Sequence, residues 1–511
     1  MSETNSIQNK APYGMIIILF IGAFVAILNE TLLNVALPSI MEEFDVNATA
    51  VQWLSTGYML INGILIPASA FLILRFTNKQ LFITAMALFT AGTLLASLAP
   101  TFGVLLAARM IQASGSAIMM PLLMNVMLTA FPVEKRGTAM GTFGLVMIVA
   151  PALGPTLSGW IVEHYSWRTL FDIVLPFSIL TLVLSVFKLK NITPQRAIKL
   201  DILSIVLSSI GFGGLLYGFS SAGDKGWDNP LVYGTIAAGA IALIVFTLRQ
   251  LRMDDPMLEF RIFKYPMFAL SSAIAIVIAI AMFSAMILMP IYVQTIRGIS
   301  PMESGLLMLP GAIVMGIMSP ITGRLFDKYG ARTLAVIGLT ITIVTTYYFS
   351  RINMDTSYTN LVLLYTFRMF GMSMVMMPVM TNGLNQLPMK DNPHGTAMNN
   401  TLQQVSGAIG SALLITVMNN RTESKAEELA ANAMANMDPS AAQQSAQAAA
   451  EMKQQLLNEA MLDGINFTFF ISTLIAVIAL VLAFFIKRVK PHHADKHVDE
   501  TVVKPSEVVT E

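Results

Sequence analysis

The chain has 511 residues, of which 55% are hydrophobic and only 12% are charged, whereas a soluble domain carries about 25% charged residues. This composition excludes an ordinary soluble domain and predicts a protein that lies mostly within a membrane. The net charge of +1 gives no basis for nucleic-acid binding, and the lack of cysteine excludes disulfides and thiolate metal sites.

Fourteen apolar runs of the sequence approach the ~20 residues that a spanning helix needs. The first, Tyr13 to Leu37, is too long for a cleavable signal peptide and lacks a small-residue cleavage site, so we expect a retained helix. The fold class predicted is an all-α integral membrane protein. The other runs begin near residues 51, 81, 102, 138 and 167, and then cover about 201–218, 231–248, 267–293, 302–321, 333–349, 361–380, 396–418 and 464–486.

The distribution of basic residues predicts the orientation of these helices. An even number of spans places both termini on one side, and most of the 31 Lys and Arg fall on that side. The positive-inside rule therefore predicts cytoplasmic termini in a bacterial inner (cytoplasmic) cell membrane. The basic loops that carry this prediction are 75–79, 135–136, 188–199, 249–264 and 324–332.

Two segments are too polar for the membrane. Residues 419–463 are external and rich in helix-forming residues, and Asp438-Pro439-Ser440 interrupts them with an N-cap residue and a proline suited to the first helical position. We expect a helical hairpin, with a disordered loop as the alternative. The cytoplasmic tail contains His492, His493 and His497, which we expect to be solvated rather than to bind metal.

An internal repeat divides the chain into two halves. The segment GRLFDKYGAR at 323–332 aligns with AFLILRFTNK at 70–79, and RMFGMSMVMMP from Arg368 resembles RMIQASGSAIMMP from Arg109. These alignments relate the second predicted helix to the tenth and the fourth to the twelfth. The separation of eight helices equals a six-helix repeat plus a two-helix insertion, and two six-helix halves are typical of transporters. The predicted units are 1–12 (N-terminal tail), 13–190 (first six-helix bundle), 201–248 (inserted helices), 249–266 (linker), 267–486 (second six-helix bundle, containing the hairpin 419–463) and 487–511 (C-terminal tail).

Four motifs in the expected order resemble those of the major facilitator superfamily, in its fourteen-helix drug/proton antiporter branch (EmrB/QacA type), and most of all its lincomycin-resistance (LmrB-like) subgroup. The segment at 323–332 matches the loop motif G-x-L-x-D-x-x-G-x-R at every defined position. The others are LNETLLNVALP at 28–38, AARMIQASGSA at 107–117 and APALGPTLSG at 150–159. The resemblance covers all fourteen predicted helices and implies a major facilitator fold.

Several positions depart from the family pattern. Asn29 stands where the branch often has Asp, so that the acid of the first motif is Glu30, one position later. The first loop motif has Leu74 and Thr77 in place of its Asp and Gly, which puts a gate built on that loop in doubt. Ala113 and Ser158 replace glycines of the fourth- and fifth-helix motifs.

Ionisable residues inside a membrane are costly and are functional candidates. Glu30 is the only carboxylate that we place deep in a helix, ~12 Å from its outer end, and Arg109 lies ~10 Å from the outer end of the fourth helix. Burial opposes ionisation of Glu30 and a nearby guanidinium favours it, so we predict that this pair couples protons. The alternative is a static ion pair. Asp172 is a second proton candidate, or else an interfacial residue near Arg168.

Polar and flexible residues on the same helices are the predicted substrate contacts. Asn34 and Gln112 lie on the helical faces of Glu30 and Arg109, and Asn29 points about 100° away; structural hydrogen bonds between helices are the alternative. Methionine-rich surfaces repack around varied ligands but also fill cores. The predicted substrate-binding set is Asn29, Asn34, Gln112, Arg368, Met372 and Met376.

Two further sets are predicted to serve packing and gating. Gly154 and Pro155 interrupt the fifth helix among small residues, which favours tight packing against a neighbour. Asp327 and its basic neighbours are predicted to form an inner gate that holds the outward-open state, as the loop motif implies. The gating and structural set is Arg75, Gly154, Pro155, Gly323, Asp327, Gly330 and Arg332.

The function predicted is proton-coupled efflux of amphipathic or hydrophobic compounds by alternating access, with no enzyme activity. No Walker A sequence is present, so we expect the proton motive force and no cofactor to drive transport. The expected partners are small amphipathic molecules, protons and membrane lipids, and we expect a monomer. The alternatives are a dedicated exporter of one physiological lipid-like or signalling solute, and a receptor or scaffold that no longer transports.

Overall fold

The computed structural model describes residues 13–46, 48–192, 195, 201–435 and 446–489. These residues form helices joined by short turns and include no β-strand, so the predicted all-α class is confirmed. Both predicted tails, with the three histidines of the second, lie outside the described residues apart from 487–489.

Fifteen α-helices follow one another along the described chain. They are α1 (Tyr13–Phe44), α2 (Ala48–Arg75), α3 (Asn78–Ser97), α4 (Phe102–Ala130), α5 (Arg136–His164), α6 (Thr169–Lys188), α7 (Ile202–Lys225), α8 (Pro230–Arg252), α9 (Pro266–Ile291), α10 (Pro301–Tyr329), α11 (Ala331–Phe349), α12 (Tyr358–Ser373), α13 (Met376–Leu384), α14 (Asn392–Ala435) and α15 (Ala446–Ala483). Four short turns of helix accompany them: η1 (Val133–Lys135), η2 (Phe260–Lys264), η3 (Tyr292–Ile296) and η4 (Met389–Asp391).

Fourteen segments among the described residues are long and apolar enough to cross a membrane, as predicted. One of them, Tyr358–Leu384, contains both α12 and α13. The helix is interrupted at Met374 and Val375, where the backbone N–H groups bond to carbonyls three residues back. Pro378 accounts for this break, because it has no N–H for the carbonyl of Met374 and its ring would clash there.

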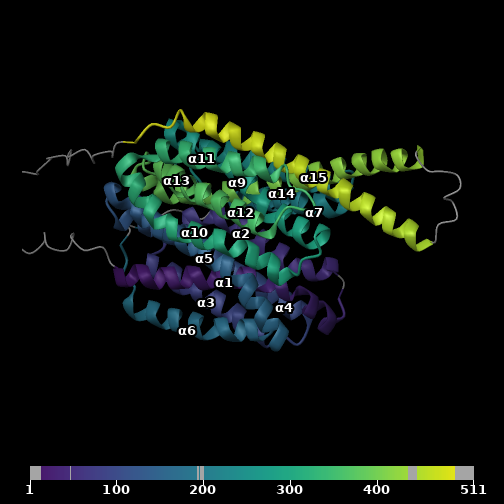
Figure 1. Cartoon of the computed structure of the whole chain (residues 1–511). Coiled ribbons are helices and arrows are strands. Elements are labelled where there is room, and N and C mark those ends of the chain that lie inside the picture. The colour runs from purple at the N-terminus through teal and green to yellow at the C-terminus, as the bar shows by residue number, and fades with distance from the viewer. Residues whose placement is uncertain (1–12, 47, 193–194, 196–200, 436–445, 490–511) are drawn as a thin grey trace, which may run out of the picture.

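The helices form two bundles with two main hydrophobic cores, of which the first extends across the contact to α9, α13 and α14. Helices α1 to α6 pack against one another, as do α9 to α15. Figure 1 shows the first bundle in purple and blue below the second, which runs from teal to yellow. This arrangement is the two-bundle architecture that the repeat predicts.

Glycines make equivalent close contacts in the two bundles. A Cβ on Gly115 of α4 would lie 2.3 Å from the carbonyl oxygen of Ala85 in α3. A Cβ on Gly371 of α12 would lie 2.7 Å from the carbonyl oxygen of Gly338 in α11. Both the α3–α4 and the α11–α12 pair therefore pack closely at a glycine, consistent with a shift of eight spans.

The bundles contact each other mainly along α5–α10 and α2–α14. The inserted helices α7 and α8 pack together beside the second contact, where α7 contacts both α2 and α14. Leu216 of α7 fills the space above Gly63 of α2, and the indole N–H of Trp227 donates to Thr416 Oγ1 of α14 at 2.6 Å. The insertion therefore touches both bundles.

Helices α14 and α15 extend beyond the bundles as two helical arms, toward the right of Figure 1. Helix α14 continues without a break past residue 418, where the predicted span ends. Arg421 Nε donates to Asp463 Oδ2 at 2.6 Å and ties the arms together at their base. The interruption predicted at 438–440 lies outside the described residues.

Candidate transport site

A cavity of about 310 Å³ lies between the two bundles. Helices α1, α2, α4 and α5 line it from one side, and α9, α13 and α14 from the other. Its polar lining residues are Glu30, Thr31, Asn62, Ser116, Asn400, Gln403 and Gln404. Its flexible apolar lining includes the methionines 59, 120, 147, 282, 286, 376 and 380. None of the described residues that line the cavity is aromatic, lysine or arginine.

Glu30 is the only carboxylate among the described residues that line this cavity. It lies within electrostatic range of Arg109 of α4. No ion pair within 4.0 Å joins Glu30 and Arg109 in the described part of the chain. The carboxylate therefore faces the cavity with a buried cation behind it at longer range.

Arg109 is fixed behind the cavity wall by contacts with α2 and with Gln112 of its own helix. Its side chain is fully buried, Nη1 donates to Gln112 Oε1 at 3.0 Å, and Nε donates to the carbonyl oxygen of Leu54 at 3.5 Å. Its guanidinium carbon lies 4.3 Å from the ring centroid of Tyr58. Gln112 Nε2 in turn donates to Thr93 Oγ1 of α3 at 2.9 Å. This network holds the positive charge in one place.

Helix α5 packs against α1 directly beside Glu30. A Cβ on Gly154 would lie 2.1 Å from Thr31 Oγ1, and Ser158 Oγ donates to the carbonyl oxygen of Leu32 at 2.5 Å. Glycine is therefore the residue that fits at position 154 unless the side chain of Thr31 moves. The side chain of Pro155 lies outside the described residues, although α5 is helical through this position.

The remaining predicted site residues are distributed around the cavity. Met376 lines it, whereas the buried side chains of Asn29 and Met372 are not among its lining residues. The side chain of Asn34 lies outside the described residues. Asp172 is exposed and accepts a hydrogen bond from Ser97 Oγ. These placements leave the predicted roles as predictions.

Arg368 is fully buried in the second bundle and does not line the cavity. Its Nη2 donates to the carbonyl oxygen of Ala281 in α9 at 2.6 Å, and its Nε donates to Thr346 Oγ1 in α11 at 3.2 Å. It therefore ties three helices of its bundle together, whereas Arg109 bonds to α2 and reaches α3 only through Gln112.

The sequence interpretation did not single out Asn62 or the three amides of α14. Asn400, Gln403 and Gln404 have the spacing i, i+3, i+4, which places them on one helical face. Three amides on one face, within the polar first part of α14, are the signal that was available. They line the cavity on the side opposite Glu30.

The two bundles are closely joined at one end of the α5–α10 contact, here called the Asp327 end. The carboxylate of Asp327, near the end of α10, accepts hydrogen bonds from the backbone N–H groups of Gly137 and Thr138 at 2.9 and 3.0 Å. Thr138 Oγ1 donates a third, at 2.8 Å. The carboxylate thus caps the N-terminus of α5, where unpaired N–H groups and the helix dipole favour negative charge.

Small residues bring α5 and α10 together beside this cap. A Cβ on Gly323 would lie 2.2 Å from the carbonyl oxygen of Gly137, and one on Gly141 would lie 2.4 Å from that of Ser319. Ser319 Oγ also donates to the carbonyl oxygen of Gly141 at 2.8 Å. Larger side chains at these positions are incompatible with this backbone approach.

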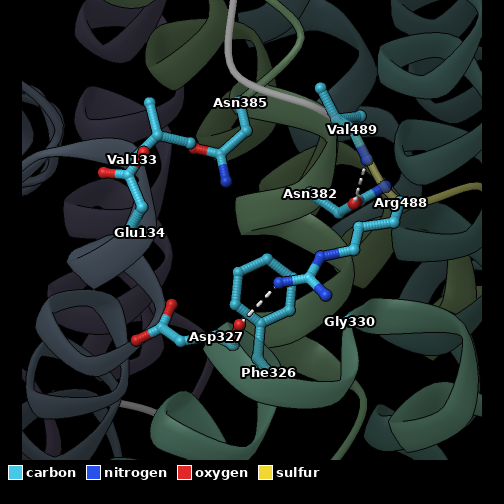
Figure 2. Close-up of a pocket in the computed structure, with 9 residues that line it drawn as sticks. All are labelled: Val133, Glu134, Phe326, Asp327, Gly330, Asn382, Asn385, Arg488 and Val489. Carbon is cyan, nitrogen blue, oxygen red and sulfur yellow. Dashed lines mark hydrogen bonds between the residues drawn. The ribbon is translucent and has the colours of Figure 1, made fainter.

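The end of the described chain covers the cap. Figure 2 shows Arg488 reaching toward Asp327 beside Asn382, with Glu134 on the opposite side. Arg488 Nη2 donates to the backbone carbonyl oxygen of Asp327 at 2.7 Å, and Asn382 Nδ2 donates to that of Lys487 at 3.3 Å. The chain after α15 is therefore fastened to both α10 and α13.

The other predicted gate residues also lie at this end. Gly330 ends α10 with φ of +81°, a conformation that favours glycine. Arg75 and Arg332 are exposed. Leu74, which stands where the repeat would place a second aspartate, is buried and has no side-chain acceptor. The capped contact at α5–α10 therefore has no aspartate counterpart at this position of the first bundle.

Comparison with known proteins gives consistent matches over most of the chain. Residues 19–411 match the family model described as Major Facilitator Superfamily. The chain is 49% identical over 499 residues to the uncharacterized MFS-type transporter YhcA of Bacillus subtilis, covering 94% of each. It is 42% identical to the lincomycin resistance protein LmrB of the same organism, covering 94% of this chain and 96% of that protein.

The fold is also similar to that of solved structures. The human organic anion transporter MFSD10 superposes with a TM-score of 0.65 at 11% identity, covering 93% of this chain and 100% of that one. This likeness concerns the fold alone.

Proposed function

Because the chain belongs to the major facilitator superfamily, and is thus a multi-pass transporter, we propose that it exports amphipathic compounds in exchange for protons. Transport proceeds by alternating access of the cavity between the bundles. The observation that carries this proposal is the position of Glu30 on the cavity wall, within electrostatic range of Arg109.

The surroundings of Glu30 favour a carboxylate that either carries a proton or contacts a substrate. A charged carboxylate without an adjacent counter-ion is costly in a membrane, so a proton or a cationic substrate stabilises it. Arg109 attracts the ionised carboxylate from behind the wall, whereas burial favours the neutral form, so that both forms are available to the exchange in this proposal. Binding of either partner thus displaces the other, as exchange requires.

The proton motive force supplies enough energy for this exchange. One charge that moves through 100 mV releases about 2.3 kcal/mol, and 1.4 kcal/mol corresponds to a factor of ten in concentration. One proton for each uncharged substrate therefore supports a gradient of more than tenfold, whereas exchange of one proton for one singly charged cation moves no net charge and is driven by the pH difference alone.

The Asp327 end is the cytoplasmic end in this proposal, because it carries the basic loop 324–332. Capping of α5 by Asp327 then holds the cavity closed toward the cytoplasm. Release of this cap, together with separation of α5 and α10 at Gly137 and Gly323, is the step that opens the cavity inward.

The similarity to lincomycin resistance proteins suggests antibiotics among the substrates. The methionine-rich wall suits ligands of different shapes, because the thioether side chains repack easily. Substrates in this proposal have one apolar part that contacts these methionines and one polar part that reaches Glu30.

Uptake into everted membrane vesicles tests the proposal. A panel of antibiotics and dyes should accumulate when a proton gradient is imposed, and Glu30→Gln should abolish accumulation without loss of protein from the membrane. Met389→Gln, at an exposed position of η4, is the matched control. Full concentrative uptake by Glu30→Gln contradicts the proposal.

A further inference from the structure

The cavity contains a buried hydrogen-bond acceptor without a donor. Asn62 of α2 is only 4% exposed, lines the cavity, and its Oδ1 has no hydrogen-bond partner among the described residues. A buried acceptor left unpaired costs free energy, and that cost is recovered when a donor reaches it. The site is therefore prepared for a ligand that brings a hydrogen-bond donor.

Asn62 lies on the same side of the cavity as Glu30. It follows Tyr58 by four residues on α2, so the two side chains share one helical face. Glu30 lines the same cavity from α1, and Arg109 behind it lies 4.3 Å from the ring centroid of Tyr58. A carboxylate and an unpaired amide oxygen thus belong to residues that line one cavity from adjacent helices.

An ammonium group with N–H bonds matches both acceptors. One N–H donates to the carboxylate of Glu30, and a second donates to Oδ1 of Asn62. A quaternary ammonium of equal charge satisfies the charge but has no N–H, so that it leaves Asn62 unpaired. Cation–π attraction gives no compensation, because none of the described lining residues is aromatic.

We propose that Asn62 and Glu30 form a subsite that selects ammonium amphiphiles with N–H bonds over quaternary ammonium amphiphiles. The amides Asn400, Gln403 and Gln404 on the opposite wall complete the site and bond to hydroxyl or amide groups next to the ammonium. This inference rests on the proposed export function, and it adds the chemical class of the substrate and the residue that selects it.

The test compares octylammonium with octyltrimethylammonium, which carry the same chain and charge but differ in their N–H bonds. Binding to the purified full-length protein in lipid nanodiscs is measured by calorimetry at pH 8, with empty nanodiscs subtracted. At this pH an alkylammonium is charged, as lysine is. The wild type should bind octylammonium more tightly, and Asn62→Leu should reduce the ratio of the two dissociation constants about tenfold, as expected for one hydrogen bond.

Asn125→Leu is the matched control. Asn125 of α4 is 1% exposed and has an unpartnered Nδ2, but it does not line the cavity. Its substitution should leave the ratio unchanged. An unchanged ratio in Asn62→Leu, an equal fall in Asn125→Leu, or no preference in the wild type overturns the inference.

A second variant decides the matter if Asn62→Leu does not fold. Asn62→Asp keeps the shape and places a second carboxylate beside the same ammonium group, so it should bind octylammonium at least tenfold more tightly than the wild type does. Unchanged octylammonium binding overturns the inference. Because binding is measured without a proton gradient, failure of proton-coupled uptake in vesicles contradicts the proposed function and leaves this result unaffected.

Discussion

Substitution of Asp327 by Asn should open the cavity toward the Asp327 end. The carboxylate accepts hydrogen bonds from Gly137 and Thr138 and caps the N-terminus of α5. Asparagine offers one acceptor oxygen in place of two and carries no charge. Its NH2 group must face at least one of the backbone N–H donors that the carboxylate now satisfies.

The size of the effect follows from these contacts. A hydrogen bond to a charged group contributes about 1.5–3 kcal/mol, and charge at a helix N-terminus contributes about 0.3–1 kcal/mol when it is partly exposed. Since Asp327 is only half-buried, loss of one bond and of the charge should cost about 2–3 kcal/mol. The equilibrium between the two access states should then shift roughly 30- to 150-fold.

Single-cysteine labelling measures this shift directly, because the chain contains no cysteine. Ala279→Cys places the reporter on the cavity wall. A membrane-impermeant maleimide is added to whole cells or to everted vesicles. In the Asp327→Asn background, labelling should become faster in everted vesicles and slower in cells.

The control for this experiment is Glu163→Gln, an exposed carboxylate near the other end of α5. It should leave both labelling rates unchanged. Equal rates for Asp327→Asn and its parent would refute the assignment of Asp327 as a gate, as would the same shift in Glu163→Gln.

Three other predictions concern packing, the helical arms of α14 and α15, and pH. Gly323→Ala should also raise the labelling rate from the Asp327 end, because its Cβ would lie 2.2 Å from the carbonyl oxygen of Gly137. Gly305→Ala should not change this rate, because Gly305 has open space around it. Equal labelling rates in the two variants contradict the packing argument. Replacement of residues 419–463 by a short Gly/Ser linker should preserve membrane insertion and folding, because a change of loop length costs little entropy. Fluorescence-detected gel filtration measures folding, and an aggregated product shows this prediction to be wrong. A folded product with altered efflux indicates that residues 419–463 act as a lid on the cavity. Burial alone would raise the pKa of Asp201, but hydrogen bonds from Arg249 and Ser204 outweigh it and hold this pKa below its usual value. The bonds to the Asp201 carboxylate therefore stabilise the fold fully at any pH above the usual pKa of aspartate, and this stabilisation is lost only as the pH falls through the lowered pKa. Asp201→Asn should thus lower Tm equally at pH 5 and pH 8. A smaller decrease of Tm at pH 5 than at pH 8 rejects this reasoning.

The spanning helices could be predicted because hydrophobicity over ~20 residues is a local property. The repeat of Arg109 and Arg368 similarly indicated two equivalent bundles, and both side chains are fully buried. The break between α12 and α13 was missed, although Pro378 marks it, because proline interrupts some spanning helices and only kinks others.

The cavity could be predicted less well, because its lining depends on how each helix is rotated in the bundle. Glu30 lines it, but its neighbour Asn29 is not among the lining residues, and only packing distinguishes the two. The partner of Asp327 is nearly two hundred residues away in sequence, at Gly137 and Thr138. No local pattern connects a loop motif to the N-terminus of a helix in the other bundle.

Proton movement driven by substrate tests the proposed coupling most directly. Purified protein is reconstituted into liposomes that contain a pH-sensitive dye, without an imposed gradient, and a substrate identified in vesicle uptake is added on one side. We predict that the substrate gradient moves protons in the opposite direction across the membrane in the wild type and that Glu30→Gln shows no such signal. Substrate movement without any change in internal pH in the wild type, or an unchanged pH signal in Glu30→Gln, would contradict proton exchange at Glu30.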